Sequence, residues 1–206
     1  GVVLPHEHIF LDLSVFYVPR VKDGCLLTGN VSIENIGMLN RDPYALKDNL
    51  IIDNYGGQLS EILRTKPFGV KTIVDATNIG IGRDPEKLKR ISLDSGINIV
   101  MGAGYYVGND KRPEVVKLTA KELAARIADE VTTGADNTDI KAGVIGEIGV
   151  SEYFGDYERK ILRASAMAQK STGAGLLIHI NPWTTLGIGA LDEIREYHVD
   201  PKKICV

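Results

Sequence analysis

The sequence predicts an α/β fold built on a parallel β-sheet, and three observations lead to this prediction. Short apolar segments alternate with longer segments of helical pattern along most of the chain. The alternating units carry no signal for antiparallel hairpins. The apolar segments are hydrophobic throughout, as expected of strands that are covered on both faces. An open doubly wound sheet and a closed (β/α) barrel both meet these conditions.

The first part of the chain begins with an apolar run at residues 1–5, which predicts a buried strand. A long segment rich in polar, Gly and Pro residues follows from about residue 12, and a helix is expected at 54–65. A β-branched run at 71–77 predicts the second strand. Asp84 and Pro85 then predict a helix start, as N-cap and first helical residue, and this helix should end near 95–96.

The same alternation continues to the end of the chain. Thr119 and Glu122 form a capping box, which predicts that a helix begins there and runs to about residue 134. The other predicted elements are strands at 97–102, 142–149 and 175–180, helices at 157–170 and 186–197, and the first residues of a sixth strand at 203–206.

Composition excludes several classes of protein. The 206 residues are 44% hydrophobic and 25% charged with a net charge of −3, which is typical of a globular domain. No basic block supports nucleic-acid binding, and no apolar run approaches the ~18–20 residues of a membrane span. No signal peptide is recognised at the start, although the abrupt opening is compatible with a lost leader. Cys25 and Cys205 lie too far apart in sequence to suggest a disulfide framework, so we expect a cytoplasmic protein.

A His-Glu-His motif follows the first predicted strand. Side chains alternate along a strand, so His6 and His8 point to one side, about 6–7 Å apart at the backbone, and Glu7 points away. Two imidazoles in this arrangement can converge on one metal ion. An isolated motif of this kind is more often an exposed loop. Here other predicted strands also end in polar groups, which favours a metal site.

These other groups are Asp75, Glu147 and His179, each at the carboxyl end of a predicted strand. Both α/β architectures place their sites there, but contributions from many strands to one site favour the barrel. The chain also has no GxGxxG after its first strand, which argues against a dinucleotide site. A complete barrel has eight strands. The sequence therefore predicts that residues 1–206 form a single incomplete TIM-barrel domain, covering strand one to the start of strand six.

Five segments resemble the phosphotriesterase family of the amidohydrolase superfamily. They are VLPHEHIFLD (3–12), GVKTIVDAT (69–77), IGRD (81–84), GAGYY (102–106) and KAGVIGEIG (141–149). The resemblance implies a (β/α)8 barrel with two divalent metal ions per chain, usually Zn²⁺. It implies a hydrolase that attacks small-molecule esters, lactones or phosphotriesters with a hydroxide bridging the two ions, and a homodimer is among the states it allows.

The resemblance also implies roles for individual residues. His6 and His8 match ligands of the more buried ion, and His179 matches a ligand of the more exposed ion. Many members carry a bridging carboxylated lysine on strand four. This chain has Glu147 instead, as some members do, so the substrate preference of lysine-type members does not transfer. Tyr106 matches a tyrosine beside the bridging hydroxide in lactonase-like members, and simple aromatic packing is an equal alternative.

Some substrate-contacting residues are expected on loops. The connection from about residue 12 to 54 is longer than usual for a barrel loop, so we expect it to lie over the mouth, with Phe16 lining the pocket. Trp183 follows the fifth strand and could line the pocket or simply pack. Asp75 could orient a histidine or serve a turn, and Arg83 could be structural or contact the substrate.

Two family ligands have no counterpart in these residues, namely a histidine ending strand six and an aspartate ending strand eight. We expect them beyond Val206, and a polypeptide without them should lack efficient catalysis. The alternative function is therefore a catalytically inactive barrel that binds a metal or another ligand. A third possibility is hydrolysis of an amide or deamination of a base, which the motifs at 102–106 and 141–149 disfavour.

Overall fold

The central element is a curled parallel sheet. The computed structural model describes residues 1–22, 24–108 and 113–206. Its main sheet has the order β1-β6-β7-β8-β9-β10, and every neighbouring pair is parallel. The six strands are β1 (Val2–Glu7), β6 (Val70–Asp75), β7 (Asn98–Ala103), β8 (Val144–Val150), β9 (Gly175–Ile180) and β10 (Ile204–Cys205).

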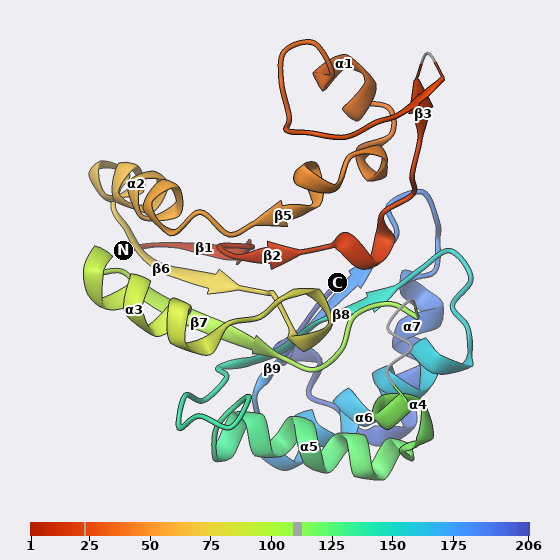
Figure 1. Cartoon of the computed structure of the whole chain (residues 1–206). Coiled ribbons are helices and arrows are strands. Elements are labelled where there is room, and N and C mark those ends of the chain that lie inside the picture. Colours follow the sequence, from red (N-terminus) through yellow and green to blue (C-terminus); the bar gives the residue numbers. More distant parts are fainter. Residues whose placement is uncertain (23, 109–112) are drawn as a thin grey trace.

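The strand order confirms the barrel prediction over the doubly wound alternative. Strands join the sheet in the order in which the chain makes them, without the reversal that marks a doubly wound fold. The sheet curls into roughly half of a barrel, with the helices on its outer side (Figure 1). The main sheet has five longer strands and the two-residue strand β10, which agrees with the six predicted strand positions.

Local signals mark the starts of several helices. The α-helices after residue 50 are α2 (Tyr55–Thr65), α3 (Pro85–Ser95), α4 (Pro113–Lys117), α5 (Ala120–Thr132), α6 (Asp156–Thr172) and α7 (Gly187–Ile194). The caps of α2, α3 and α5 show these signals. The Asp84 side chain accepts from the Lys87 N–H, and Gly96 ends α3 at a φ of 68°. The predicted capping box of Thr119 and Glu122 is present. Among the described helices, none combines the length and apolar character that crossing a bilayer requires.

One predicted helix is shorter than expected. The pattern at 186–197 predicts a single helix, but α7 ends at Ile194 and a 3-10 turn, Arg195–Tyr197, completes the segment. His198 follows with a φ of 52° and an exposed side chain. The left-handed residue ends the helical path and turns the chain towards β10.

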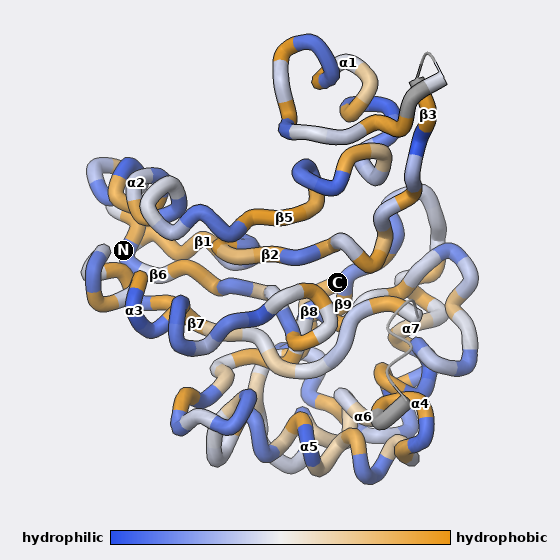
Figure 2. Tube along the Cα trace, viewed as in Figure 1, coloured by the Kyte–Doolittle hydropathy of each residue, from blue (hydrophilic) through white to orange (hydrophobic). Residues whose placement is uncertain are grey.

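The hydrophobic core lies between the sheet and its helices. Ile145 and Ile148 of β8 are fully buried, as are Ile91, Ile127 and Leu162 on the helices. Figure 2 shows hydrophobic residues running along the strands of the main sheet. This layer fixes the sheet's curvature and so the positions of the strand ends that carry the site.

The prediction that the first strand is buried was wrong. Five of the six residues of β1 are exposed, including Val2 and Val3. The physical reason is the position of β1 at one end of the sheet order, where β6 is its one partner among the described residues. Hydrophobicity alone does not distinguish an edge strand from a covered one.

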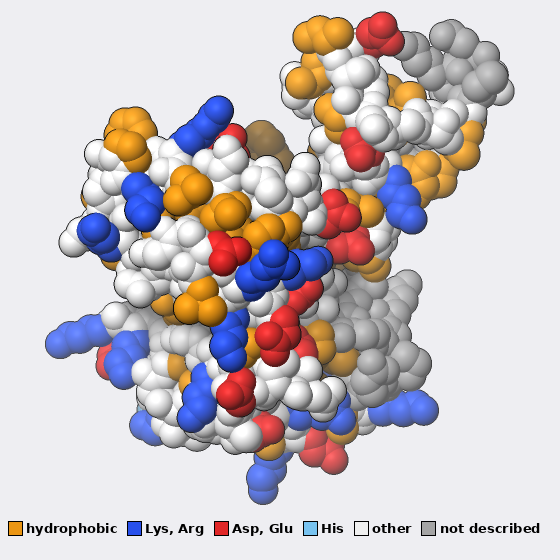
Figure 3. Space-filling model, turned by 60° about the vertical axis from the view of Figure 1, so that its left-hand side comes forward, with side chains coloured by type: hydrophobic (Ala, Val, Ile, Leu, Met, Phe, Trp, Pro, Cys, Tyr) orange, Lys and Arg blue, Asp and Glu red, His pale blue; other side chains and the backbone are white. Residues whose placement is uncertain are grey.

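The long connection after β1 folds into a separate lobe, residues 13–50, which projects from the body (Figures 1 and 3). The lobe begins and ends at an antiparallel pair, β2 (Leu11–Asp12) with β5 (Ile51–Ile52). It contains a second such pair, β3 (Val21–Lys22) with β4 (Cys25–Leu26), the short helix α1 (Ile36–Leu39), and a small core of its own around Leu39, Ala45 and Leu46. The sequence did not predict these antiparallel pairs, because strands of two residues carry no periodic signal.

Candidate metal centre

Three predicted ligands from three strands converge at the carboxyl end of the sheet. His6 Nε2 of β1 lies 2.7 Å from Glu147 Oε2 of β8, and His179 Nδ1 of β9 lies 3.2 Å from the same oxygen. The possible ligand atoms of these residues all lie within 4.8 Å of one another. Residues 6, 147 and 179 therefore form one cluster, which the parallel topology assembles from distant parts of the chain.

The fourth predicted ligand approaches the other carboxylate oxygen. His8 Nε2 lies 3.4 Å from Glu147 Oε1. The rings of His6 and His8 have centroids 5.5 Å apart, so the two side chains do lie on one side of the strand end. His6 nevertheless groups with His179 around Oε2, and His8 stands at Oε1. The carboxylate thus has imidazole nitrogens at both oxygens, as a bridging ligand would.

The donor set fits a divalent cation. Imidazole and carboxylate are good ligands for Zn²⁺ and similar ions. Oε2 of Glu147 is buried and accepts no hydrogen bond of normal geometry from the described residues, although two ring nitrogens lie close to it. A buried polar atom without such a bond calls for an explanation, and an ion held between the ring nitrogens and the carboxylate is one.

The electrostatics of the cluster favour an ionised carboxylate. Burial alone would raise the pKa of Glu147, but the imidazoles of His179 and His8 outweigh it and lower that pKa to about 2. Burial would likewise lower the pKa of His8, yet Glu147, Asp75 and Glu7 raise it overall. Glu147 therefore carries a full negative charge at neutral pH, and this charge attracts cations to the site.

The backbone around Glu147 explains why a glycine precedes it. Gly146 has a φ of 129°, and a Cβ there would lie 2.4 Å from the Leu177 carbonyl oxygen. Only glycine fits this close approach of β8 to β9. On the other side, Asn78 Nδ2 donates to the Glu147 carbonyl oxygen at 2.6 Å. Both contacts fix the backbone from which the carboxylate projects.

Two side chains at the end of β6 surround His8. Asp75 accepts from the backbone N–H groups of Ile9 and Thr77, so its carboxylate ties the two strand ends together. Thr77 Oγ1 lies 2.9 Å from His8 Nδ1. Sequence reasoning missed Thr77, although its position at the end of a predicted strand is the signal that could have found it.

A row of aromatic rings borders the cluster. The ring centroid of Tyr106 lies 5.8 Å from that of His179 and 6.1 Å from that of Phe16. The lobe supplies Phe16 and also Tyr44, whose ring centroid lies 6.0 Å from that of Phe16. Burial and the negative charge of Glu147 raise the pKa of Tyr106, so its hydroxyl stays protonated at neutral pH. Tyr44 is a further residue that the sequence did not indicate.

Trp183 is placed differently from Phe16 and Tyr106. Its side chain is 92% exposed, and its backbone N–H donates to Asn181 Oδ1 at 2.9 Å. Among the described residues it is the most exposed large hydrophobic side chain. The structure does not pack it against the histidines, and a substrate-binding role for it stays a prediction.

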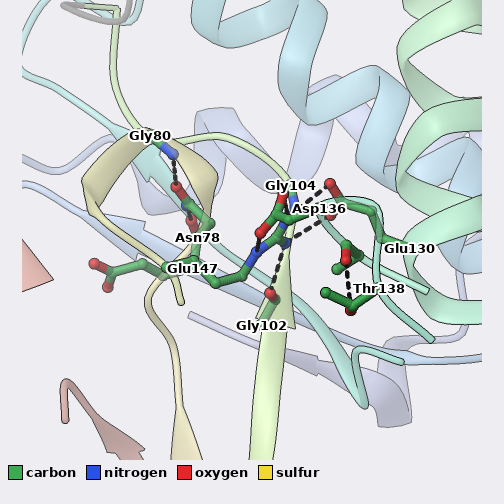
Figure 4. A network of polar contacts seen from close by, with 10 residues as sticks. Asn78, Gly80, Gly102, Gly104, Glu130, Asp136, Thr138 and Glu147 are labelled. Atoms are coloured by element: carbon green, nitrogen blue, oxygen red, sulfur yellow. Dashed lines mark hydrogen bonds and ion pairs between the residues drawn. The ribbon is translucent and has the colours of Figure 1, made fainter. Parts of the chain in front are cut away.

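Arg83 is the centre of a buried network next to the site, and its partners Gly102, Glu130 and Asp136 are labelled in Figure 4. Its side chain is fully buried and donates to both carboxylate oxygens of Glu130 and of Asp136 and to the Gly102 carbonyl oxygen. These contacts use all five N–H donors of the guanidinium. Burial would lower the pKa of Arg83, but the two carboxylates raise it overall. In Figure 4 the Glu147 carboxylate points away from this network, so Arg83 has a structural role.

The Arg83→Lys variant is expected to unfold more easily than the wild type. A lysine cannot reproduce two bidentate pairs, so several buried acceptors lose their donors, at a cost of about 1–3 kcal/mol in the free energy of unfolding. Chemical denaturation measures the difference. Arg64→Lys is the matched control, because the Arg64 side chain is 74% exposed and forms an ion pair with Glu61 three residues away. A stability loss equal in the two variants would contradict the structural role.

Fold and site together define a class of protein. They describe an α/β barrel protein whose candidate metal ligands stand at the carboxyl ends of its parallel strands. The family model described as "Phosphotriesterase family" matches residues 1–206. The chain therefore belongs to the phosphotriesterase family, as the sequence motifs predict.

Similar proteins support this assignment. A "Phosphotriesterase-related protein" of Nematostella vectensis is 37% identical over 184 residues, which cover 87% of this chain and 53% of the relative. An "N-acetyltaurine hydrolase" of Xenopus tropicalis is 35% identical, and the match covers 87% of this chain and 52% of the relative. The chain thus spans about half the length of the curated relatives it matches.

Two solved structures share the fold. A resiniferatoxin-binding protein from Rhodobacter sphaeroides superposes with a TM-score of 0.94 at 37% identity, covering 99% of this chain and 57% of that chain. The phosphotriesterase homology protein from Escherichia coli, solved with phosphate in its active site, superposes with a TM-score of 0.80 at 27% identity, covering 99% and 61%.

Proposed function

We propose that the complete protein is a metal-dependent hydrolase whose ions are held by His6, His8, Glu147 and His179. The observation that carries this proposal is the buried Glu147 Oε2, which accepts no hydrogen bond of normal geometry and lies close to two imidazole nitrogens from different strands. When bound, divalent ions would lower the pKa of a water molecule and polarise the oxygen of the bond to be cleaved. Membership of a hydrolase family supports the same reading.

The residues of this chain have distinct tasks in that proposal. Glu147 supplies negative charge between two cations that would otherwise repel each other. The three histidines supply neutral ligands that hold the ions in place. Phe16, Tyr44 and Tyr106 form an aromatic row that shields one side of the site and can contact the apolar part of a small-molecule substrate.

The bond that is cleaved has two candidates. The family resemblance favours an ester, a lactone or a phosphotriester. A specific observation favours an amide: several relatives that are 33–36% identical bear the name "N-acetyltaurine hydrolase", and N-acetyltaurine is an N-acyl amide. Amide hydrolysis, which the motifs disfavour, is therefore the second candidate. A metal-activated water can attack either kind of carbonyl group.

Metal content and turnover of the complete, natively purified protein test the proposal. We expect about two divalent ions per chain, as in other two-metal hydrolytic sites. Elemental analysis measures the ions, and assays with a γ-lactone, an aryl phosphotriester and N-acetyltaurine identify the bond. Metal without turnover on any substrate would favour the inactive binding relative. Absence of both metal and turnover, even after addition of zinc or manganese, would overturn the proposal.

A further inference from the structure

Thr77 occupies a position that links a candidate metal ligand to the backbone of the neighbouring strand. It lies two residues after the end of β6 and is 1% exposed. Its hydroxyl oxygen lies 2.9 Å from Nδ1 of His8 and 3.1 Å from the carbonyl oxygen of Phe10. Both partners lie just after β1, so the hydroxyl bridges two points of one strand end.

The single proton of the Thr77 hydroxyl decides which ring nitrogen of His8 carries a hydrogen atom. A threonine hydroxyl has one proton to donate, and a carbonyl oxygen can only accept. The hydroxyl of Thr77 donates to the Phe10 carbonyl oxygen, so its oxygen is left to accept from His8 Nδ1–H. The reverse orientation would deprive the carbonyl of Phe10, a residue only 3% exposed, of this donor. Nδ1 is therefore the protonated nitrogen.

The other ring nitrogen then carries the lone pair that a metal ligand needs. Nε2 of His8 lies 3.4 Å from Glu147 Oε1, on the side of the ring that faces the cluster. A neutral imidazole with its proton on Nδ1 can bind a cation only through Nε2. The hydrogen bond to Thr77 thus aims the correct nitrogen at the site.

The residues that hold Thr77 in place are buried and hydrogen-bonded. Asp75 is fully buried, and its two carboxylate oxygens accept from the N–H groups of Ile9 and Thr77. The N–H of Ala76 donates to the carbonyl oxygen of Glu7. The backbone on both sides of His8 is therefore tied to residues 75–77, which also fix the position of the threonine hydroxyl.

We propose that Thr77 is a positioning residue, whose hydroxyl holds His8 in the Nδ1–H tautomer and so prepares Nε2 to bind a divalent cation. This inference rests on the proposed metal-dependent function. It adds a residue that touches neither the ion nor the substrate and acts through the ring of His8. Partners of this kind commonly raise metal affinity by about 10–100-fold.

A pair of near-isosteric variants tests the inference in the complete protein. Thr77→Val removes the hydroxyl and keeps the volume, and Thr77→Ser keeps the hydroxyl. Competition with a chelator for Zn²⁺ measures the affinity of each protein. We expect Thr77→Val to weaken zinc binding by about 10–100-fold and Thr77→Ser to stay close to the wild type.

Imidazole nitrogen NMR of the wild-type zinc form should show His8 protonated at Nδ1 and bound through Nε2.

The outcomes separate this inference from the function on which it rests. Tight zinc binding that is equal in wild type and Thr77→Val would overturn the role of Thr77 and leave the metal site intact. A wild-type protein that binds neither zinc nor manganese would overturn the proposed function and this inference with it. If Thr77→Val does not fold, the NMR signature of the wild type decides, since binding of zinc through Nδ1 would contradict the assigned tautomer.

Discussion

Replacing Glu147 by glutamine is expected to lower kcat/KM of the complete protein by more than about 10³-fold, beyond the 10²–10³-fold typical for loss of one electrostatic contact at an active site. Glutamine keeps the shape of the side chain and removes its charge. Two cations at the site would then face each other without a negative group between them, and their affinity would fall as well. The fold should survive, because a neutral side chain is easier to bury than an ionised one.

The measurement combines steady-state kinetics on the preferred substrate with elemental analysis of the variant. Glu34→Gln is the matched control. Glu34 is an exposed glutamate of the lobe, so this substitution makes the same chemical change away from the site. The control should keep wild-type metal content and rate. A wild-type rate in Glu147→Gln would show that another group bridges the ions.

Replacing His6 by alanine is expected to remove about one divalent ion per chain and to abolish most of the activity. A metal ion held by few protein ligands loses most of its affinity when one of them is removed. His6 lies closer to Glu147 Oε2 than the other histidines do, at 2.7 Å. Its side chain is 42% exposed, so its removal should cost little folding stability. The ion count per chain by elemental analysis is the direct readout.

His198→Ala provides a control of identical chemistry. His198 directly follows the 3-10 turn Arg195–Tyr197, and its side chain is exposed. This variant should retain both ions and full activity. An unchanged ion count in His6→Ala would refute the assignment of His6 as a ligand.

Local sequence patterns were sufficient for much of the fold. The capping box of Thr119 and Glu122 and the Asp84-Pro85 pair predicted helix starts correctly, because these signals depend on hydrogen bonds within one turn. Strand alternation predicted that His6 and His8 share a side, and their rings lie 5.5 Å apart. The placement of Glu147 and His179 at one sheet edge followed from parallel topology, since all carboxyl ends of the strands meet there.

Other features had no local signal. The lobe is closed by the β2–β5 pair, which forms only when residues 11–12 and 51–52 meet, and it contains a small core around Leu46. From the sequence, Arg83 is simply a charged residue in a loop. The tertiary structure brings Glu130 and Asp136 to it, and its guanidinium forms ion pairs with both. The exposure of Val2 and Val3 depends on the place of β1 in the sheet, which hydrophobicity does not encode.

The sequence by itself determined the class of fold, the family and the residue types of the candidate site, because periodicity, caps and motifs are properties of neighbouring residues. The tertiary structure alone decided how these residues meet: His6 and His179 at one oxygen of Glu147, His8 at the other, and Thr77 behind His8. The physical reason is that contacts between strands separated by tens of residues depend on sheet curvature and register. These are set by packing of the whole core rather than by any local segment.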